Sequence, residues 1–128
     1  MKHGQLLIAG ALALMSACGG PDEKPATFTN VQTDVFSLSC VFSACHKGAA
    51  PAGEMSLEGD AFDDIVDVLS MQVPTKLRVK PGDPDGFYLM DKLLGKQTVG
   101  DQMPQGASLE EERLDFVRRW IMAGAPDN

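Results

Sequence analysis

The chain is organised around one stretch, which reads Ser39-Cys40-Val41-Phe42-Ser43-Ala44-Cys45-His46-Lys47-Gly48. This stretch brings two thiols and an imidazole together within seven residues, from Cys40 to His46. His46 is also the only histidine after residue 17, so no second imidazole is available outside the N-terminal segment. We expect the remaining segments to be arranged around these three side chains.

Two thiols followed at once by an imidazole are the arrangement that covalent attachment of haem c requires. Each thiol adds to a vinyl group of the porphyrin, and the adjacent histidine reaches the iron. The common form has two residues between the cysteines, whereas four residues separate Cys40 from Cys45. The stretch therefore resembles the rarer, long-spaced attachment motif. It predicts that Cys40 and Cys45 carry the haem and that His46 is the proximal iron ligand.

The first 17 residues have the features of an export signal. Lys2 supplies a positive charge, and the apolar run that follows, residues 6–15, is too short to span a bilayer. Met15-Ser16-Ala17-Cys18 resembles the lipobox of bacterial lipoproteins, in which the cysteine is acylated and becomes the new N-terminus. We therefore expect a lipoprotein signal peptide over 1–17, lipid on Cys18, and a flexible linker over 18–27. Several acyl chains on one residue give stable membrane anchoring.

Two other interpretations of the central stretch stay open. Outside the cytoplasm, Cys40 and Cys45 could instead form a disulfide. The chain would then be a disulfide-stapled lipoprotein without haem that acts as a binding or structural module. Cys40, Cys45 and His46 could also bind a bare metal ion, but no fourth protein ligand is evident nearby.

The composition is acidic, with 11 Lys and Arg residues against 18 Asp and Glu residues. The formal net charge of -7 becomes -8 once Lys2 leaves with the signal peptide. No basic patch is present, so nucleic acid is not an expected partner. We expect a protein held by its lipid at a membrane surface on the periplasmic or outer-membrane side, with redox proteins as partners.

Residues 28–128 predict one all-α domain of about four helices. Apolar residues recur at helical spacing in four segments, at about 28–38, 60–69, 86–94 and 108–123. Thr29 with Gln32 and Ser108 with Glu111 have the form of capping boxes, and Asp85 is a further expected N-cap. The last two helices are expected to end at Gly95 and Gly124.

A second axial ligand for the iron is sought among the methionines, because a thioether favours ferrous iron. Met90 and Met122 lie on helical segments, where core packing is the usual role, and Met55 and Met71 lie in segments without clear structure. Met103 differs, because it is a lone apolar residue in a polar loop and directly precedes Pro104. We therefore expect Met103 to be the distal ligand.

Four segments together resemble a known family. They are Cys40 to His46, Val79-Lys80-Pro81-Gly82-Asp83-Pro84-Asp85, Met103-Pro104-Gln105-Gly106, and Arg119-Trp120-Ile121-Met122-Ala123-Gly124-Ala125-Pro126. This set is similar to the class I-type cytochrome c domains of exported planctomycete and myxobacterial proteins, over roughly residues 28 to 126.

The resemblance implies a small cytochrome c-like helical haem domain whose first and last helices cross. It further implies thioether links at Cys40 and Cys45, proximal ligation by His46 and distal ligation by Met103. The chain departs from the family in its cysteine spacing and in Gln105, where such loops often have proline. The expected function is single-electron transfer outside the cytoplasm by a lipid-anchored c-type cytochrome, and not enzyme catalysis, because both axial positions of the iron are filled by protein.

Overall fold

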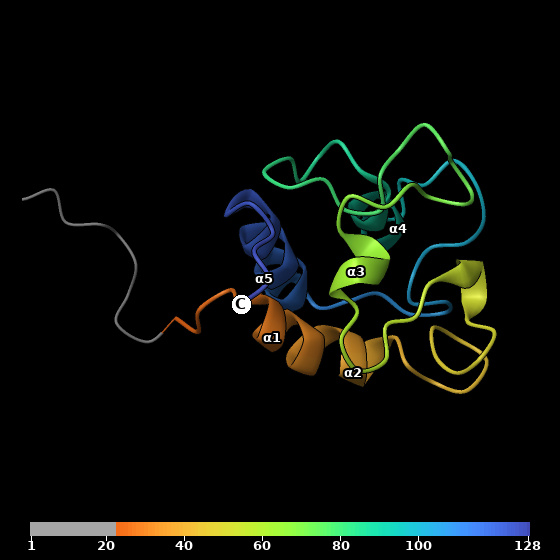
Figure 1. Ribbon diagram of the computed structural model, residues 1–128, viewed down its shortest axis with the longest axis horizontal. Coiled ribbons are helices and arrows are strands. Elements are labelled where there is room, and N and C mark those ends of the chain that lie inside the picture. Colours follow the sequence, from red (N-terminus) through yellow and green to blue (C-terminus); the bar gives the residue numbers. More distant parts are fainter. Residues whose placement is uncertain (1–22) are drawn as a thin grey trace, which may run out of the picture.

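The computed structural model describes residues 23–128. The predicted signal peptide and the lipidation site at Cys18 lie outside the described residues. The described elements, in chain order, are α1 (Phe28–Val31), η1 (Gln32–Phe36), α2 (Ser37–Ser39), η2 (Ala52–Glu54), α3 (Phe62–Ile65), α4 (Tyr88–Leu94) and α5 (Glu111–Met122). Two isolated β-bridges are the only sheet-like pairings within residues 23–128, so the predicted all-α class is confirmed (Figure 1).

The first three elements form one continuous helical run that leads into Cys40, as predicted. Its N-cap is Thr27 and not Thr29, since the Thr27 hydroxyl accepts a hydrogen bond from the Asn30 N–H at 3.2 Å. Gln32 has a different role from the capping one expected for it. Its side chain is buried, donates to the Leu57 carbonyl at 2.8 Å and accepts from the Ala61 N–H at 3.3 Å. Gln32 thereby ties the helical run to the segment before α3.

The predicted second helix is much shorter than its apolar pattern indicated. α3 ends at Ile65, and Val66 adopts an extended conformation. The backbone then bonds to the segment around Val79 instead of continuing a helix: the Val79 N–H donates to Ile65, and the Asp67 N–H donates to Val79, both at 3.0 Å. Val66 is β-branched and fits an extended strand-like segment better than a helix.

The last two helices also begin later than predicted. α4 starts at Tyr88, after an extended Phe87, and Asp85 does not cap it. α5 starts at Glu111, and the structure shows no side-chain cap at its N-terminus. The predicted C-terminal ends of these two helices agree with the structure. Gly95 is the left-handed residue that ends α4, and α5 stops before Gly124, whose φ is +97°.

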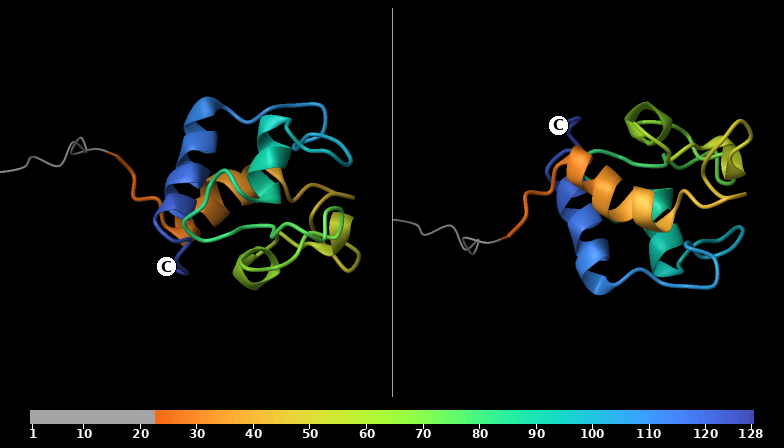
Figure 2. Two further views of the ribbon diagram at one scale, coloured as in Figure 1. Left: turned by 90° about the horizontal axis from the view of Figure 1, so that it is seen from above. Right: turned by 90° about the horizontal axis from the view of Figure 1, so that it is seen from below.

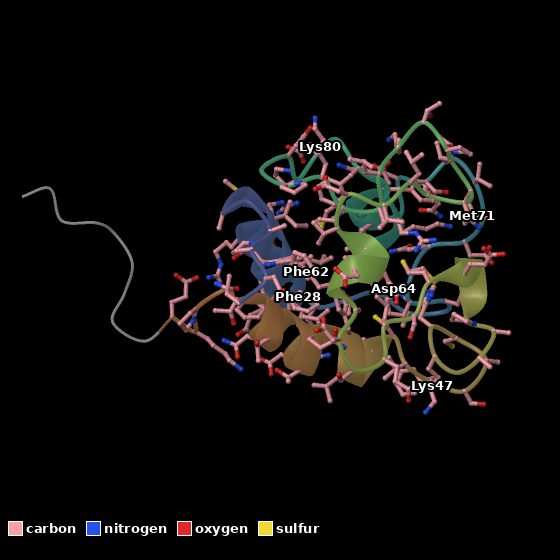
Figure 3. All side chains as sticks on the ribbon, viewed as in Figure 1. Phe28, Lys47, Phe62, Asp64, Met71 and Lys80 are labelled. Atoms are coloured by element: carbon pink, nitrogen blue, oxygen red, sulfur yellow. The ribbon has the colours of Figure 1, made fainter. Side chains whose placement is uncertain are left out.

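The core lies where α5 crosses the N-terminal helical run (Figure 2). Trp120 of α5 is fully buried, and its ring centroid lies 5.5 Å from that of Phe28. Phe28 also meets Phe62 of α3 edge-on, with centroids 5.3 Å apart (Figure 3). The Trp120 indole N–H donates to the Pro126 carbonyl at 2.9 Å, which leaves this large side chain fully satisfied. Three helices thus share one aromatic contact cluster.

Both ends of the described chain lie at the same end of the molecule (Figure 1). Asn128 accepts hydrogen bonds from the backbone N–H groups of Phe28 and Thr29, each at 2.9 Å. The loops that contain Cys40 to Met55 and the loop 95–107 lie at the opposite end (Figures 1 and 2). Within residues 23–128, none of the helices combines the length and the apolar character needed to cross a bilayer.

The aromatic cluster predicts a large penalty for truncating Trp120. Trp120→Ala removes a fully buried side chain and its hydrogen bond, so we expect a loss of about 3–5 kcal/mol in the free energy of unfolding. Urea denaturation followed by circular dichroism measures this change. Met122→Ala, two residues further along α5 but exposed, is the control and should cost less than about 0.5 kcal/mol. Equal losses in the two variants would contradict the assigned core.

Candidate functional site

One cavity of about 370 Å³ lies at the end of the molecule away from the two chain ends. Its walls come from the end of the N-terminal helical run, the loops at 40–46, 52–57 and 70–72, helix α4, and the loop at 103–107. The lining is mostly apolar. The volume falls in the range of about 300–1,000 Å³ that is common for cofactor and ligand sites. A larger but more open, polar depression along 101–108 contains no predicted donor.

Cys40, Cys45, His46 and Met103 all line this one cavity. The first three come from the loop that follows the N-terminal helical run, and Met103 comes from the loop that follows α4. The structure therefore brings together the side chains that the sequence analysis singled out within the described residues, although Met103 lies far from the other three along the chain.

The four residues between the cysteines fold into a compact turn. The Cys45 N–H donates to the Phe42 carbonyl at 3.0 Å, and the His46 N–H donates to the Cys40 carbonyl at 3.2 Å. Ala44 has a φ of +65°, which reverses the chain direction before Cys45. The turn thus accommodates the four residues between the cysteines, and the His46 backbone stays next to that of Cys40. Both thiols are free in the structure.

Burial raises the pKa of the Cys40 thiol to about 11, and the neighbouring charge of Cys45 contributes in the same direction. Cys40 follows the last residue of α2, and its N–H bonds to the Phe36 carbonyl at 2.9 Å. The thiol is therefore held against the apolar cavity wall in its protonated form at neutral pH. Such a sulfur is protected from non-specific oxidation, because the thiolate is the reactive form.

The ring of His46 has a defined orientation and tautomer. Its Nδ1 lies 3.2 Å from the carbonyl oxygen of Met55. Because a carbonyl oxygen can only accept, Nδ1 carries the proton, and in the neutral imidazole the lone pair is on Nε2. The backbone is fixed as well, since the Leu57 N–H donates to the His46 carbonyl at 2.8 Å. Metal-binding histidines are usually held by such a bond on the second ring nitrogen.

Met103 is held in place by α4. The Met103 N–H donates to the Lys92 carbonyl at 2.9 Å, and the next residue is Pro104, joined by a cis peptide bond. The Gln102 amide donates to the Leu93 carbonyl at 3.3 Å. Tyr88 donates through its hydroxyl to the Val99 carbonyl at 2.6 Å. The loop is thus tied to α4 at the methionine and at two residues before it, Val99 and Gln102.

The other methionines are placed differently. Met90 is buried in the core, as expected, whereas Met122, for which core packing was also expected, is exposed. Met55 and Met71 both line the cavity. The Met71 side chain is 57% exposed and points out among the loops at the cavity end (Figure 3). Met55 contributes its carbonyl to His46, so its backbone already has a role in the site.

The donors surround the cavity instead of meeting at a point. Over residues 23–128, no three Cys, His, Asp or Glu side chains converge closely enough to hold a single metal ion. The interpretation of Cys40, Cys45 and His46 as a bare-metal site therefore gains no support from the described residues. A ligand that contacts all of these donors has to be extended.

Two cavity residues were missed by the sequence analysis. Arg78 and Lys92 are both buried and both line the cavity. Burial lowers the pKa of Lys92, and the negative charge of Asp101 partly opposes this effect. The sequence contains only a weak signal for them, in that Arg78 stands between Leu77 and Val79 and Lys92 lies beside Leu93.

No protein-family model, no curated protein and no solved structure matches this chain. The class of protein is therefore defined by its own fold and site. It is a small, acidic, mostly helical domain whose loops enclose an apolar cavity, with two thiols, one imidazole and one anchored thioether at its walls.

The raised pKa of Cys40 predicts slow alkylation of its thiol in the haem-free protein. With a pKa of about 11, only about one thiol in a thousand is ionised at pH 8, against about one in ten at the ordinary value of 9.0. In a Cys18→Ala variant, which keeps Cys45, iodoacetamide should react with Cys40 about a hundredfold more slowly in the folded state than in urea. The folded-state rate should rise about tenfold per pH unit from pH 7 to 9. Mass spectrometry follows the reaction, and equal folded and unfolded rates would contradict the prediction.

Proposed function

We propose that this chain is a c-type cytochrome that carries single electrons outside the cytoplasm. The observation that supports the proposal is that Cys40, Cys45, His46 and Met103 line one apolar cavity. These are the two thiols, the imidazole and the thioether that covalent, His/Met-ligated haem needs. When bound, the haem iron supplies a one-electron redox couple.

The residues at the cavity fit such a group in their chemistry. His46 offers a free Nε2 lone pair, because Nδ1 is used by the Met55 carbonyl. Met103 is positioned by a backbone bond to α4, so its thioether needs no loop closure to reach the cavity. With haem bound, the apolar lining would limit access of water to the iron and make charge changes there more costly, which is one means by which a protein sets a reduction potential.

The roles of the four residues follow from these positions. Cys40 and Cys45 would carry the thioether links, and His46 and Met103 would be the proximal and distal ligands. If His46 and Met103 both bound the iron, it would have no open position for a substrate, so the proposed protein is an electron carrier and not an enzyme. Its proposed cofactor is haem c, and its proposed partners are redox proteins.

The proposed location is a membrane surface outside the cytoplasm. Cys18 would carry the lipid, and residues 18–27 would link it to the domain. The last residues of this linker, 23–27, contain no helix or strand, in keeping with a tether. The acidic charge fits redox proteins with basic surfaces better than nucleic acid. Periplasmic or outer-membrane attachment follows from the lipobox resemblance.

Haem content is the direct test of the proposal. Protein produced in a host with cytochrome c maturation machinery should be red, should show a Soret band, and should carry the mass of one haem after denaturation. A Cys40→Ala, Cys45→Ala double variant should lose the covalent haem, because no thiol then remains in residues 23–128. Colourless wild-type protein with a Cys40 to Cys45 disulfide would instead favour the binding or structural lipoprotein.

Met103 should be the ligand among the three methionines that line the cavity. Met103→Ala should keep the covalent haem but lose the near-infrared charge-transfer band of Met-ligated ferric haem. Met71→Ala removes an exposed methionine from the same cavity and should leave the band unchanged. Absorption spectra of the two oxidised variants decide the question. Loss of the band in Met71→Ala alone would reassign the distal ligand.

Cys18 should determine membrane attachment. The Cys18→Ala variant removes the acylated thiol, so we expect the protein to leave the detergent phase in Triton X-114 partitioning or to remain uncleaved. Membrane attachment by several acyl chains is strong, so the change should be nearly complete. Unaltered partitioning of the variant would exclude Cys18 as the anchor.

A further inference from the structure

Among residues 23–128, the buried charged groups are all of one sign. Within residues 23–128, Arg78 and Lys92 are the only charged side chains that are buried, each 8% exposed, and both line the cavity. No carboxylate is buried with them. Neither cation takes part in any ion pair of the described residues. Buried charges are usually paired, so two unpaired cations at one cavity require an explanation.

Arg78 is held by backbone carbonyls from two separate segments. Nη1 donates to the Asp64 carbonyl at 2.7 Å, and Nη2 donates to those of Gly53 and Glu54 at 3.1 and 3.3 Å. A guanidinium has five N–H donors, so two remain. One is on Nη1 and the other on Nε, and Nε is not sealed off, because the only sealed side-chain polar atom without any partner among the described residues is Gln97 Oε1. The carbonyls orient the cation but carry no charge that neutralises it.

Lys92 is held in the same way on the α4 side of the cavity. Its Nζ donates to the carbonyls of Val99 and Asp101 at 2.8 and 3.1 Å and lies 5.2 Å from the centroid of the Tyr88 ring. One of its three donors remains. The Asp101 carboxylate accepts a hydrogen bond from Gln105 at 2.7 Å and forms no ion pair with Lys92. Lys92 is therefore a second oriented cation that faces the cavity without a charged partner.

Two oriented cations in a mostly apolar cavity indicate a ligand with an apolar body and two separate anionic groups. Arg78 and Lys92 bond to different segments, 53–64 and 99–101, so a single small anion does not account for both. We infer that Arg78 and Lys92 bind the two propionate carboxylates of the haem, and this inference rests on the proposed function. The neutralisation explains why buried cations are tolerated here, since opposite charges in a water-poor site attract strongly.

This assignment has a consequence for the reduction potential. The oxidised iron carries one more positive charge than the reduced iron. A cation near the iron therefore favours the reduced form, either directly or by neutralising a nearby carboxylate. Replacing either cation with a neutral residue should shift the one-electron equilibrium about tenfold toward the oxidised form, which equals about 59 mV.

The test compares variants of the matured, full-length protein at pH 7. Arg78→Gln and Lys92→Gln should each lower the midpoint potential by this amount. Arg78→Lys and Lys92→Arg keep the charge, so their midpoint potentials should stay close to the wild-type value. This should hold for Arg78→Lys even if its contacts with the backbone carbonyls are weaker. Arg118→Gln and Lys96→Gln remove cations that do not line the cavity, and they should change the equilibrium less than about twofold. If Arg78 had only a structural role, Arg78→Lys would lose it as Arg78→Gln does, and the midpoint potential would not depend on the charge at this position.

A second measurement needs no substitution. In the reduced, diamagnetic wild-type protein, nuclear Overhauser contacts should join the propionate methylene protons to the Arg78 δ protons and the Lys92 ε protons. Red protein without these contacts, or with equal potentials in the Gln variants and the two controls, would overturn the inference while leaving the proposed function standing. Colourless wild-type protein would instead overturn the proposed function itself, and the inference with it.

Discussion

The hydrogen bond from the Met103 N–H to the Lys92 carbonyl is the constraint on which the cavity depends. The helical walls of the cavity come from the end of the N-terminal helical run, the short η2 and α4, and loops form the rest. Loops keep a defined shape only where their backbone groups find partners. The bond at Met103 supplies such a backbone partner on the α4 side of the cavity. The turn in which the His46 N–H donates to the Cys40 carbonyl supplies one on the other side.

The two sides of the cavity are connected through the core. The N-terminal helical run leads directly into Cys40, and α5 and α3 pack on the first turn of that run. Gln32 then fixes the segment 57–61, which follows the loop that holds Met55 and the carbonyl for His46. The position of the imidazole is thus determined by a chain of short contacts that begins at Trp120. A disturbance of the aromatic cluster would be transmitted to the site along this path.

Much of the helix pattern could be predicted, but not the helix ends. The segment at 60–69 was expected to be one helix because Phe62, Ile65, Val66 and Leu69 have helical spacing. Spacing does not reveal that a distant segment offers better partners, and Val79 does so here. The capping boxes were also misplaced, because Gln32 finds Leu57 and Ala61 as partners in the folded chain. Such long-range competition is not visible in local sequence.

The four residues proposed for the site stand out in the sequence more clearly than the helix ends do, because they belong to rare residue types. Only one histidine and two cysteines are found after residue 18, so few combinations were possible. Met103 was identified by its isolation in a polar loop. Arg78 and Lys92 could not be identified, since a cation in sequence is usually solvated and only the fold buries these two. Their backbone-carbonyl partners belong to segments that meet only in three dimensions.

The shared position of the two chain ends has a consequence for architecture. Asn128 bonds to the start of α1, so both ends leave the domain at a common corner, and the residues that line the cavity come from the other end of the molecule. Polypeptide or lipid joined at that corner would not cover the cavity mouth. A unit with this layout can be appended to, or inserted between, other modules without rebuilding its interior.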